Sequence, residues 1–291
     1  MRLDTKIRLL QAFNHVATIP AIAYAIYTQQ YYLFVVALAS WLVIGPISSV
    51  ITLHRLLTHR SFKTYIWLET ILSYVSVIST VGPTISWVAL HRQHHATSDR
   101  EGDPHSPWVN GKFNFIQAIK VWLGYEWHIP NIPITYVKDL MRNQTHKFIF
   151  NNYFKIIFLF SLLLCLIDPV LWLFIYVVPA SMTVHLIGVV NVLGHGHGYR
   201  NYDTPDRSTN SWIANIVSLG DGWHNNHHAH GIRYHSGERW WEWDLMGSII
   251  KLIKKNNGNF LYTPSRIGLC ACSKNRHGYE KNHKRLDQTE F

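Results

Sequence analysis

The chain has 291 residues, of which 48% are hydrophobic and 15% charged, and it carries a formal net charge of +10. A charged fraction this far below the roughly 25% of soluble domains argues against an ordinary soluble protein. The three cysteines do not provide a disulfide framework, which excludes the small disulfide-stapled class. The positive charge suits nucleic acid, anionic lipid or an acidic partner, and composition alone does not select among them.

Four apolar stretches are each long enough to cross a hydrocarbon core of about 30 Å as a helix. They cover about residues 11–28, 31–53, 148–167 and 170–190. Polar residues from Thr28 to Gln30 separate the first two stretches, and Asp168-Pro169 separates the last two. We therefore predict a single all-α integral membrane domain over residues 1–291, with four transmembrane helices arranged as two hairpins.

The basic residues indicate the side of the membrane on which each segment lies. Three precede the first predicted span, ten lie between the two hairpins and thirteen follow the last span, whereas neither hairpin turn contains one. Segments rich in Lys and Arg stay in the cytoplasm. Both termini and a helical cap, formed by residues 54–147 and 191–255, are thus predicted to be cytoplasmic. Residues 256–291 are predicted to be a polar tail.

A further apolar stretch, residues 65–90, is long enough for a fifth span. A fifth crossing would move most of the basic residues to the outer side. Glu69 and the break at Gly82-Pro83 also argue against a continuous membrane helix. We predict that this stretch lies along the inner face or enters the membrane without crossing it.

Three histidine motifs stand out among the 19 histidines of the chain. Two of them repeat the pattern H-x-x-H-H, of which about 0.08 copies are expected by chance in a chain of this composition. The first motif is "HRLLTHRSF", with His54 and His59; the second is "HRQHHATSD", with His91, His94 and His95; the third is "GWHNNHHAH", with His224, His227 and His228. The remaining histidines, apart from His195 and His197 discussed below, are expected to be ordinary polar side chains: His15, His105, His128, His146, His185, His230, His235, His277 and His283.

The spacing of these motifs predicts a metal centre. Positions i, i+3 and i+4 share one face of a helix, and neutral imidazole is a common ligand of iron, copper and zinc. Eight histidines exceed the three or four ligands of a usual zinc site, so two metals are predicted. His54 and His59 lie about 140° apart on an ideal helix, so we expect the helix to end or unwind between them. Two nitrogen-ligated metals beside a membrane point to iron and O2 chemistry on a lipid.

With these motifs the chain resembles the membrane fatty acyl desaturases of the stearoyl-CoA type, close to their bacterial and cyanobacterial members. The resemblance runs from about residue 30 to 255 and rests on "HRLLTHRSFKT", "HRQHHATSD" followed by "DPHS", "NVLGHGHGYRNYD", "GDGWHNNHHAH" and "WWEWD". It implies two Fe²⁺ ions in the cap, held by the eight motif histidines and His195, with Asn191 reaching one iron through water. It implies no catalytic side chain beyond these ligands.

The resemblance also implies the reaction and its partners. O2 is the co-substrate, and two electrons come from a separate carrier, a ferredoxin or a small cytochrome with its reductase. The product is a cis double bond, with the H-x4-H spacing of the first motif favouring Δ9, in an acyl chain held as acyl-CoA or acyl-lipid. The implied location is a bacterial inner membrane with the active site on the cytoplasmic side; no nucleic acid is expected to bind.

Two other functions stay open from the residues alone. Histidine motifs of this kind also suit a di-iron hydroxylase or ketolase acting on a lipid, alkane or carotenoid. A non-enzymatic protein that stores or moves a metal is the third class, although transport would put ligands inside the spans. A second histidine, His197, follows His195 in "HGHG"; at two residues further along the helix it faces away, so we predict that it binds no iron.

Overall fold

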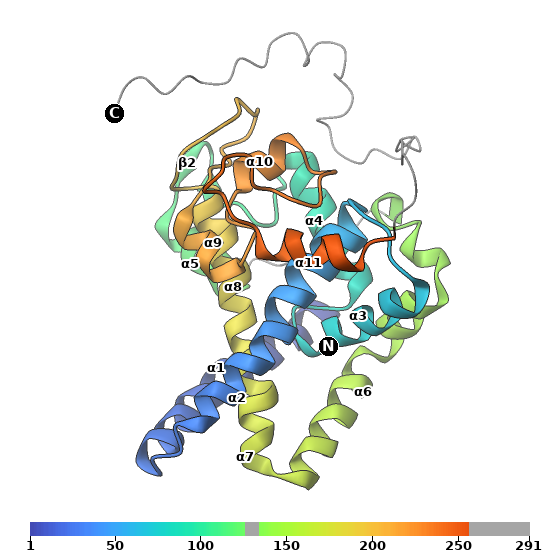
Figure 1. Ribbon diagram of the computed structural model, residues 1–291, viewed down its shortest axis with the longest axis vertical. Coiled ribbons are helices and arrows are strands. Elements are labelled where there is room, and N and C mark those ends of the chain that lie inside the picture. The colour runs from blue at the N-terminus through green and yellow to red at the C-terminus, as the bar shows by residue number, and fades with distance from the viewer. Residues whose placement is uncertain (126–133, 256–291) are drawn as a thin grey trace.

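The computed structural model describes residues 1–125 and 134–255. The predicted polar tail at 256–291 lies outside the described residues, as do His128, His277 and His283. Four long helical segments form one end of the molecule, and shorter helices gather at the other end (Figure 1). All four long segments are long and apolar enough to cross a membrane.

The first two of these segments lie near the N-terminus. α1 covers Leu3–Tyr27, and α2 covers Tyr32–Leu42 before continuing as the π-helix η1 over Val43–Thr58. The other two are α6, Gln144–Ile167, and a segment made of α7 (Pro169–Trp172), the short π-helix η4 (Leu173–Val177) and α8 (Val178–Gly194). Each segment is longer than the span predicted from hydropathy, because its polar end continues the helix past the apolar stretch.

Capping residues set the connection between the last two segments. Asp168 accepts hydrogen bonds from the backbone N–H groups of Val170 and Leu171, at 2.7 and 3.2 Å, and Pro169 occupies the first turn of α7. An Asp cap followed by Pro is a strong helix start. The predicted break at this position is therefore confirmed. In Figure 1 α6 meets α7, and α1 meets α2, at the end away from the shorter helices.

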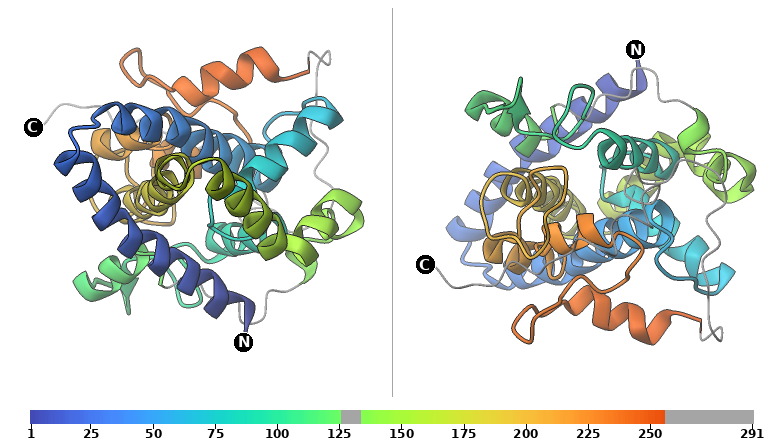
Figure 2. Two further views of the ribbon diagram at one scale, coloured as in Figure 1. Left: turned by 90° about the horizontal axis from the view of Figure 1, so that it is seen from below. Right: turned by 90° about the horizontal axis from the view of Figure 1, so that it is seen from above.

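Burial differs strongly among the four segments. In the most apolar part of Pro169–Gly194, 78% of the residues are buried, against 22% in Leu3–Tyr27 and 17% in Gln144–Ile167. The α7–α8 segment therefore lies at the centre, and Figure 2 shows it nearly end-on between the other helices. α8 packs against α1, α2, η1, α5 and α9. The exposed apolar side chains of α1 and α6, among them Val16, Leu159 and Leu163, suit contact with lipid.

The stretch 65–90 forms two helices. α3 covers Ile66–Ile78 and α4 covers Thr84–Thr97, so the predicted break at Gly82-Pro83 is confirmed. Gly82 has φ +116°, a backbone conformation that residues with side chains rarely adopt, and Pro83 occupies the N-cap position of α4 in an extended conformation. With 13 and 14 residues, both helices are shorter than the roughly 20 residues that a membrane-crossing helix needs.

The remaining elements lie around the C-terminal ends of η1 and α8. They are the helices α5 (Phe115–Trp122), α9 (Trp212–Ser218), α10 (His224–Ala229) and α11 (Leu245–Ile253), and the short 3₁₀ segments Ile134–Tyr136 and Leu140–Arg142. Side chains of Asn114, Ser211 and Asp244 cap α5, α9 and α11. Buried side chains of η1, α4, α8 and α11 form the main apolar core. This shared core fixes the end of η1, which carries the first histidine motif, relative to the end of α8, which is followed by His195.

One element corrects the all-α prediction. Residues Trp108–Val109 (β1) and Lys112–Phe113 (β2) form a small antiparallel hairpin in which Trp108 lies opposite Phe113. The turn residues Asn110 and Gly111 both have positive φ, at 51° and 75°, as a two-residue type I′ turn requires. Asn-Gly is the strongest short-range hairpin signal, so the all-α prediction was wrong at a position where the sequence indicates a hairpin.

Candidate metal centre

Nine histidines of the described residues meet in two groups. The ligand nitrogens within each group all lie within 4.8 Å of one another. The five-histidine group contains His54, His59, His91, His95 and His227, and the four-histidine group contains His94, His195, His224 and His228. Only His59 is partly exposed, and the other eight rings are buried. The structure thus brings together every histidine that the sequence and the resemblance singled out as a ligand.

The first motif reaches the centre through an unusual helix. We expected the helix to end or unwind between His54 and His59. The chain instead winds as the π-helix η1 up to Thr58, and the N–H of His59 donates to the carbonyl of His54 at 3.1 Å. In this winding, residues five apart occupy consecutive turns and lie above one another. The two rings are therefore neighbours, with centroids 4.8 Å apart.

The second and third motifs each serve both groups. On α4, His91 and His95 belong to the five-histidine group, whereas His94 belongs to the four-histidine group. On α10 the arrangement is reversed, because His224 and His228 belong to the four-histidine group and His227 crosses to the other. Each motif therefore gives an i, i+4 pair to one group and a single ring to the other.

Four buried carboxylates hold the rings in place. Nδ1 of His54, His94, His195 and His228 lies 2.8 Å from an oxygen of Asp221, Asp103, Asp99 and Asp206, respectively. A carboxylate at Nδ1 fixes the tautomer and leaves Nε2 for a metal. These aspartates are the functional residues that the sequence analysis missed. In the sequence, these aspartates could be recognised only by their position near the motifs, because each lies 3 to 22 residues from a motif histidine. They stand in the segments "HHATSDREGDPHS", "YDTPDRS" and "GDGWH".

The protonation of the rings also suits metal binding. Burial, followed by repulsion from neighbouring imidazoles, holds the pKa values of His59, His91, His95, His224 and His227 well below their ordinary value. These rings are neutral at physiological pH, which is the form that binds a metal. For His195, burial lowers the pKa but the Asp99 carboxylate outweighs it, so the pKa lies above the usual range.

The inward nitrogens fit metal ions. Nε2 atoms face one another at 3.0 Å between His54 and His227 and at 3.0 Å between His195 and His224. In each pair one ring, that of His54 or His195, is held at Nδ1 by a carboxylate, so its Nε2 points at the other ring, and a metal ion placed between the two nitrogens would be bound by both. Nε2 of His59 and of His94 is buried with no hydrogen-bond partner among the described residues. Both groups therefore have the donor set and the orientation of a metal site.

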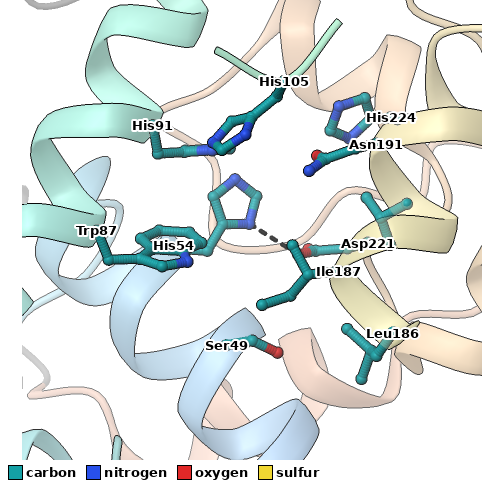
Figure 3. A pocket seen from close by; sticks show the side chains of 11 residues that line it. Ser49, His54, Trp87, His91, His105, Leu186, Ile187, Asn191, Asp221 and His224 are labelled. Atoms are coloured by element: carbon teal, nitrogen blue, oxygen red, sulfur yellow. Dashed lines mark hydrogen bonds and ion pairs between the residues drawn. The ribbon is translucent and has the colours of Figure 1, made fainter. Parts of the chain in front are cut away.

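A pocket is lined by rings of both groups, His54 and His91 of the one and His224 of the other (Figure 3). In the view of Figure 3, His91, His105, Asn191 and His224 lie above, and Ser49 and Leu186 lie below. Trp87, Ile187, Val190 and Asp221 complete the lining. Asn191 is buried on α8, one turn before His195, and its Nδ2 has no hydrogen-bond partner among the described residues. This placement suits the water-mediated contact that the resemblance implies.

Two histidines outside the groups, His197 and His105, differ in their burial. His197 is exposed beyond the end of α8 and belongs to neither group. His105 was expected to be an ordinary polar side chain, and this expectation is wrong. It is 3% exposed, lines the pocket, and has its ring 5.5 Å from that of His94. Burial lowers the pKa of His105 to about 3.

The Asp206→Asn variant is expected to bind metal about 10-fold more weakly, because the carboxylate that orients His228 loses its charge. The rate at which a chelator removes metal from the purified protein measures the change. Asp203→Asn, at an exposed aspartate of the same loop, is the matched control. Equal rates for the two variants would contradict an orienting role for Asp206.

Comparisons with known proteins agree with this geometry. A family model described as fatty acid desaturase matches residues 32–245, a range that includes all nine histidines. The chain is 35% identical over 226 residues to an sn-1 stearoyl-lipid 9-desaturase of Anabaena variabilis, covering 75% of this chain and 79% of that protein. It is 34% identical to an acyl-CoA C20 Delta5-desaturase of Anemone leveillei, covering 76% and 70%. Delta-9 acyl-lipid desaturase 1 of Arabidopsis thaliana is 33% identical, with coverages of 72% and 69%.

Proposed function

Because this chain belongs to the fatty acid desaturase family, we propose that it introduces a cis double bond at Δ9 of a saturated acyl chain, using O2 and two irons. It is an oxidoreductase that desaturates fatty acyl chains. The observation that carries the proposed reaction of an acyl chain at two irons is the pocket, which is lined by rings of both histidine groups and by apolar side chains. The reaction converts one saturated chain, O2, two electrons and two protons into a monoene and two waters.

The polar and the apolar residues that line the pocket have distinct roles in this proposal. The nine grouped histidines would hold the irons, with Asn191 holding a water beside them. Bound iron would supply the activation of O2 that breaks an unactivated C–H bond, which no side chain can perform. Trp87, Leu186 and Ile187 present an apolar surface to methylene groups and exclude water from the reacting carbons. Trp87 also stacks on His91, with ring centroids 4.9 Å apart, which fixes the wall relative to the five-histidine group.

The relatives support Δ9 and both acyl carriers. The Anabaena and Arabidopsis proteins are named as 9-desaturases of lipid-linked chains, and the Anemone protein as a Delta5-desaturase of acyl-CoA. We propose acyl-CoA or acyl-lipid as substrate and a separate ferredoxin or small cytochrome as electron donor. Membrane lipid surrounds the four long segments, and no nucleic acid takes part.

Lipid analysis after expression in a bacterial host tests the reaction. New monoenes with the double bond at carbon 9 support the proposal, provided that they vanish in a His227→Ala variant of equal abundance. Oxygenated products would favour the hydroxylase or ketolase. Unchanged lipids, from a protein that still binds metal, would favour metal storage.

The purified, active chain is expected to contain two irons, because the nine ligands form two groups and not one. Elemental analysis together with the protein concentration measures the ratio. One zinc per chain and no iron in active protein would contradict this proposal.

We also propose two membrane hairpins with the cap, and both chain ends, on the cytoplasmic side of a bacterial inner membrane. α3 and α4 are too short to cross, and the first and second motifs meet in one group. Single cysteines at the exposed positions Lys63 and Arg100, in a background in which Cys165, Cys270 and Cys272 are replaced by serine, are expected to label from the same side of sealed vesicles. A cysteine at Gln29, in the first hairpin turn, is expected to label from the other side. Labelling of positions 63 and 100 from opposite sides would refute the arrangement.

A further inference from the structure

One surface patch of the cap is built around an aromatic side chain. We define the Trp108 patch as Trp108, Lys112 and Phe113 of the β-hairpin together with Arg207. The Arg207 guanidinium lies 4.0 Å from the centroid of the Trp108 ring, and Phe113 meets that ring edge-on at 5.6 Å. Lys112, Phe113 and Arg207 are exposed, and Trp108 is partly exposed. A planar guanidinium stacked on an indole holds both groups in a fixed orientation.

Two hydrogen-bonded connections join this patch to one histidine of the metal centre. The indole Nε1–H of Trp108 donates to the carbonyl oxygen of His195 at 2.6 Å. The backbone N–H of Arg207 donates to the Asp99 carboxylate at 2.7 Å. The same carboxylate lies 2.8 Å from Nδ1 of His195. His195 itself is fully buried. Arg207 thus reaches the His195 ring through two hydrogen bonds, and Trp108 reaches the backbone of the same residue through one.

We infer that the Trp108 patch is the docking site of an external one-electron carrier and that electrons enter the metal centre there through Trp108 and His195. The inference rests on the proposed desaturation, which consumes two electrons per double bond. Two carriers are each oxidised by one electron, and O2 leaves as two waters after taking these electrons, two protons and two hydrogens of the chain. Electron transfer slows steeply with distance through space, so a bonded route from the surface is favoured.

The surroundings of the patch indicate the chemistry of the carrier. Besides Arg207 and Lys112, Arg100 and Arg200 lie nearby in sequence, against Glu101 and Asp203. The carboxylates beneath the patch, Asp99 and Asp206, are bonded to His195 and His228 and are largely buried. The patch itself presents two exposed cations, Lys112 and Arg207, beside an aromatic centre and contains no carboxylate, which fits an acidic carrier with its redox group near its surface. The hairpin lies at the end of the molecule away from the long helices, where a soluble protein can reach it (Figure 1).

The test compares two routes of reduction in the iron-loaded full chain. A reduced plant-type [2Fe–2S] ferredoxin is mixed with oxidised enzyme without O2, and its reoxidation is followed by stopped flow. Arg207→Glu is expected to lower the second-order rate constant about tenfold, because it reverses the charge that attracts the carrier. Arg142→Glu, the same change at an exposed arginine of the 3₁₀ segment Leu140–Arg142, is the matched control and is expected to change it less than twofold.

A second variant separates docking from transfer. Trp108→Phe keeps a ring under Arg207 but removes the Nε1 donor, so it is expected to lower the rate at saturating ferredoxin several-fold. Enzyme reduced with dithionite and then exposed to O2 and substrate gives a single-turnover yield that needs no carrier. If Arg207→Glu lowers that yield as much as the ferredoxin rate, or behaves like Arg142→Glu with ferredoxin, the docking site is wrong. If the unmodified protein gives no monoene even after dithionite, the proposed desaturation itself fails.

Discussion

Replacement of His195 by alanine is expected to abolish desaturation and to lower the bound iron by about half. His195 is buried in the four-histidine group, and its loss removes one of only four ring nitrogens there. The Asp99 carboxylate would also lose the imidazole that it holds at 2.8 Å. The product yield in membranes and the iron content of the purified variant measure the two effects.

His197→Ala is the matched control for this experiment. His197 lies two residues further on, is exposed, and belongs to neither group, so this variant is expected to keep near-normal iron and measurable activity. Asn191→Ala is expected to fall between the two, with most of its iron but a much lower rate, since it removes a group that holds water and not a direct ligand. Loss of iron from His197→Ala but not from His195→Ala would show that the assignment of ligands at the end of α8 is wrong.

Arg55→Ala is expected to lower the free energy of unfolding by about 3–5 kcal/mol, the range for breaking a buried ion pair from one side. The Arg55 side chain is 1% exposed and donates to both carboxylate oxygens of Asp244, at 3.1 and 2.8 Å. It also donates to Asp221 at 3.0 Å, the carboxylate that holds His54. Removing the cation leaves two buried carboxylates without their partner and loosens a ligand of the five-histidine group.

Thermal unfolding in detergent measures this loss against Arg60→Ala. Arg60 also pairs with a carboxylate, that of Asp139, but its side chain is 43% exposed and Arg92 still contacts Asp139 when Arg60 is removed. Exposed pairs contribute about 0–1 kcal/mol, so this variant is expected to unfold within a few degrees of the unmodified chain. Equal destabilisation by the two substitutions would contradict the special role of Arg55.

The long apolar segments and the ligand histidines were predictable because each leaves a local pattern. The length of a run of apolar residues is enough to predict a membrane-spanning helix, and the spacing of H-x-x-H-H indicates that its histidines share one face of a helix. The division of each motif between two groups was not predictable, because it depends on how α4 and α10 are placed against each other. The same holds for Asp99 and Asp206, which meet their histidines only after the chain has folded.

Two misjudged positions have a physical explanation. The expected unwinding after His54 assumed that a helix has 3.6 residues per turn, whereas η1 is wound more widely and brings His59 above His54. His105 stands in the "DPHS" piece of the resemblance, but this segment has no periodic pattern from which the position of its ring in the pocket could be predicted. Irregular segments take their position from tertiary contacts, and here those contacts put a polar ring where a reactant would lie.

The sharing of α4 and α10 between the two histidine groups has a consequence for assembly of the centre. Each helix contributes to both groups, so neither group can be ordered without constraining both helices. With two metals bound as proposed, the first ion would hold α4 and α10 in register, so the second ion would meet rings that are already placed. A chain filled in one group would then bind an ion in the other group more tightly than an empty chain does.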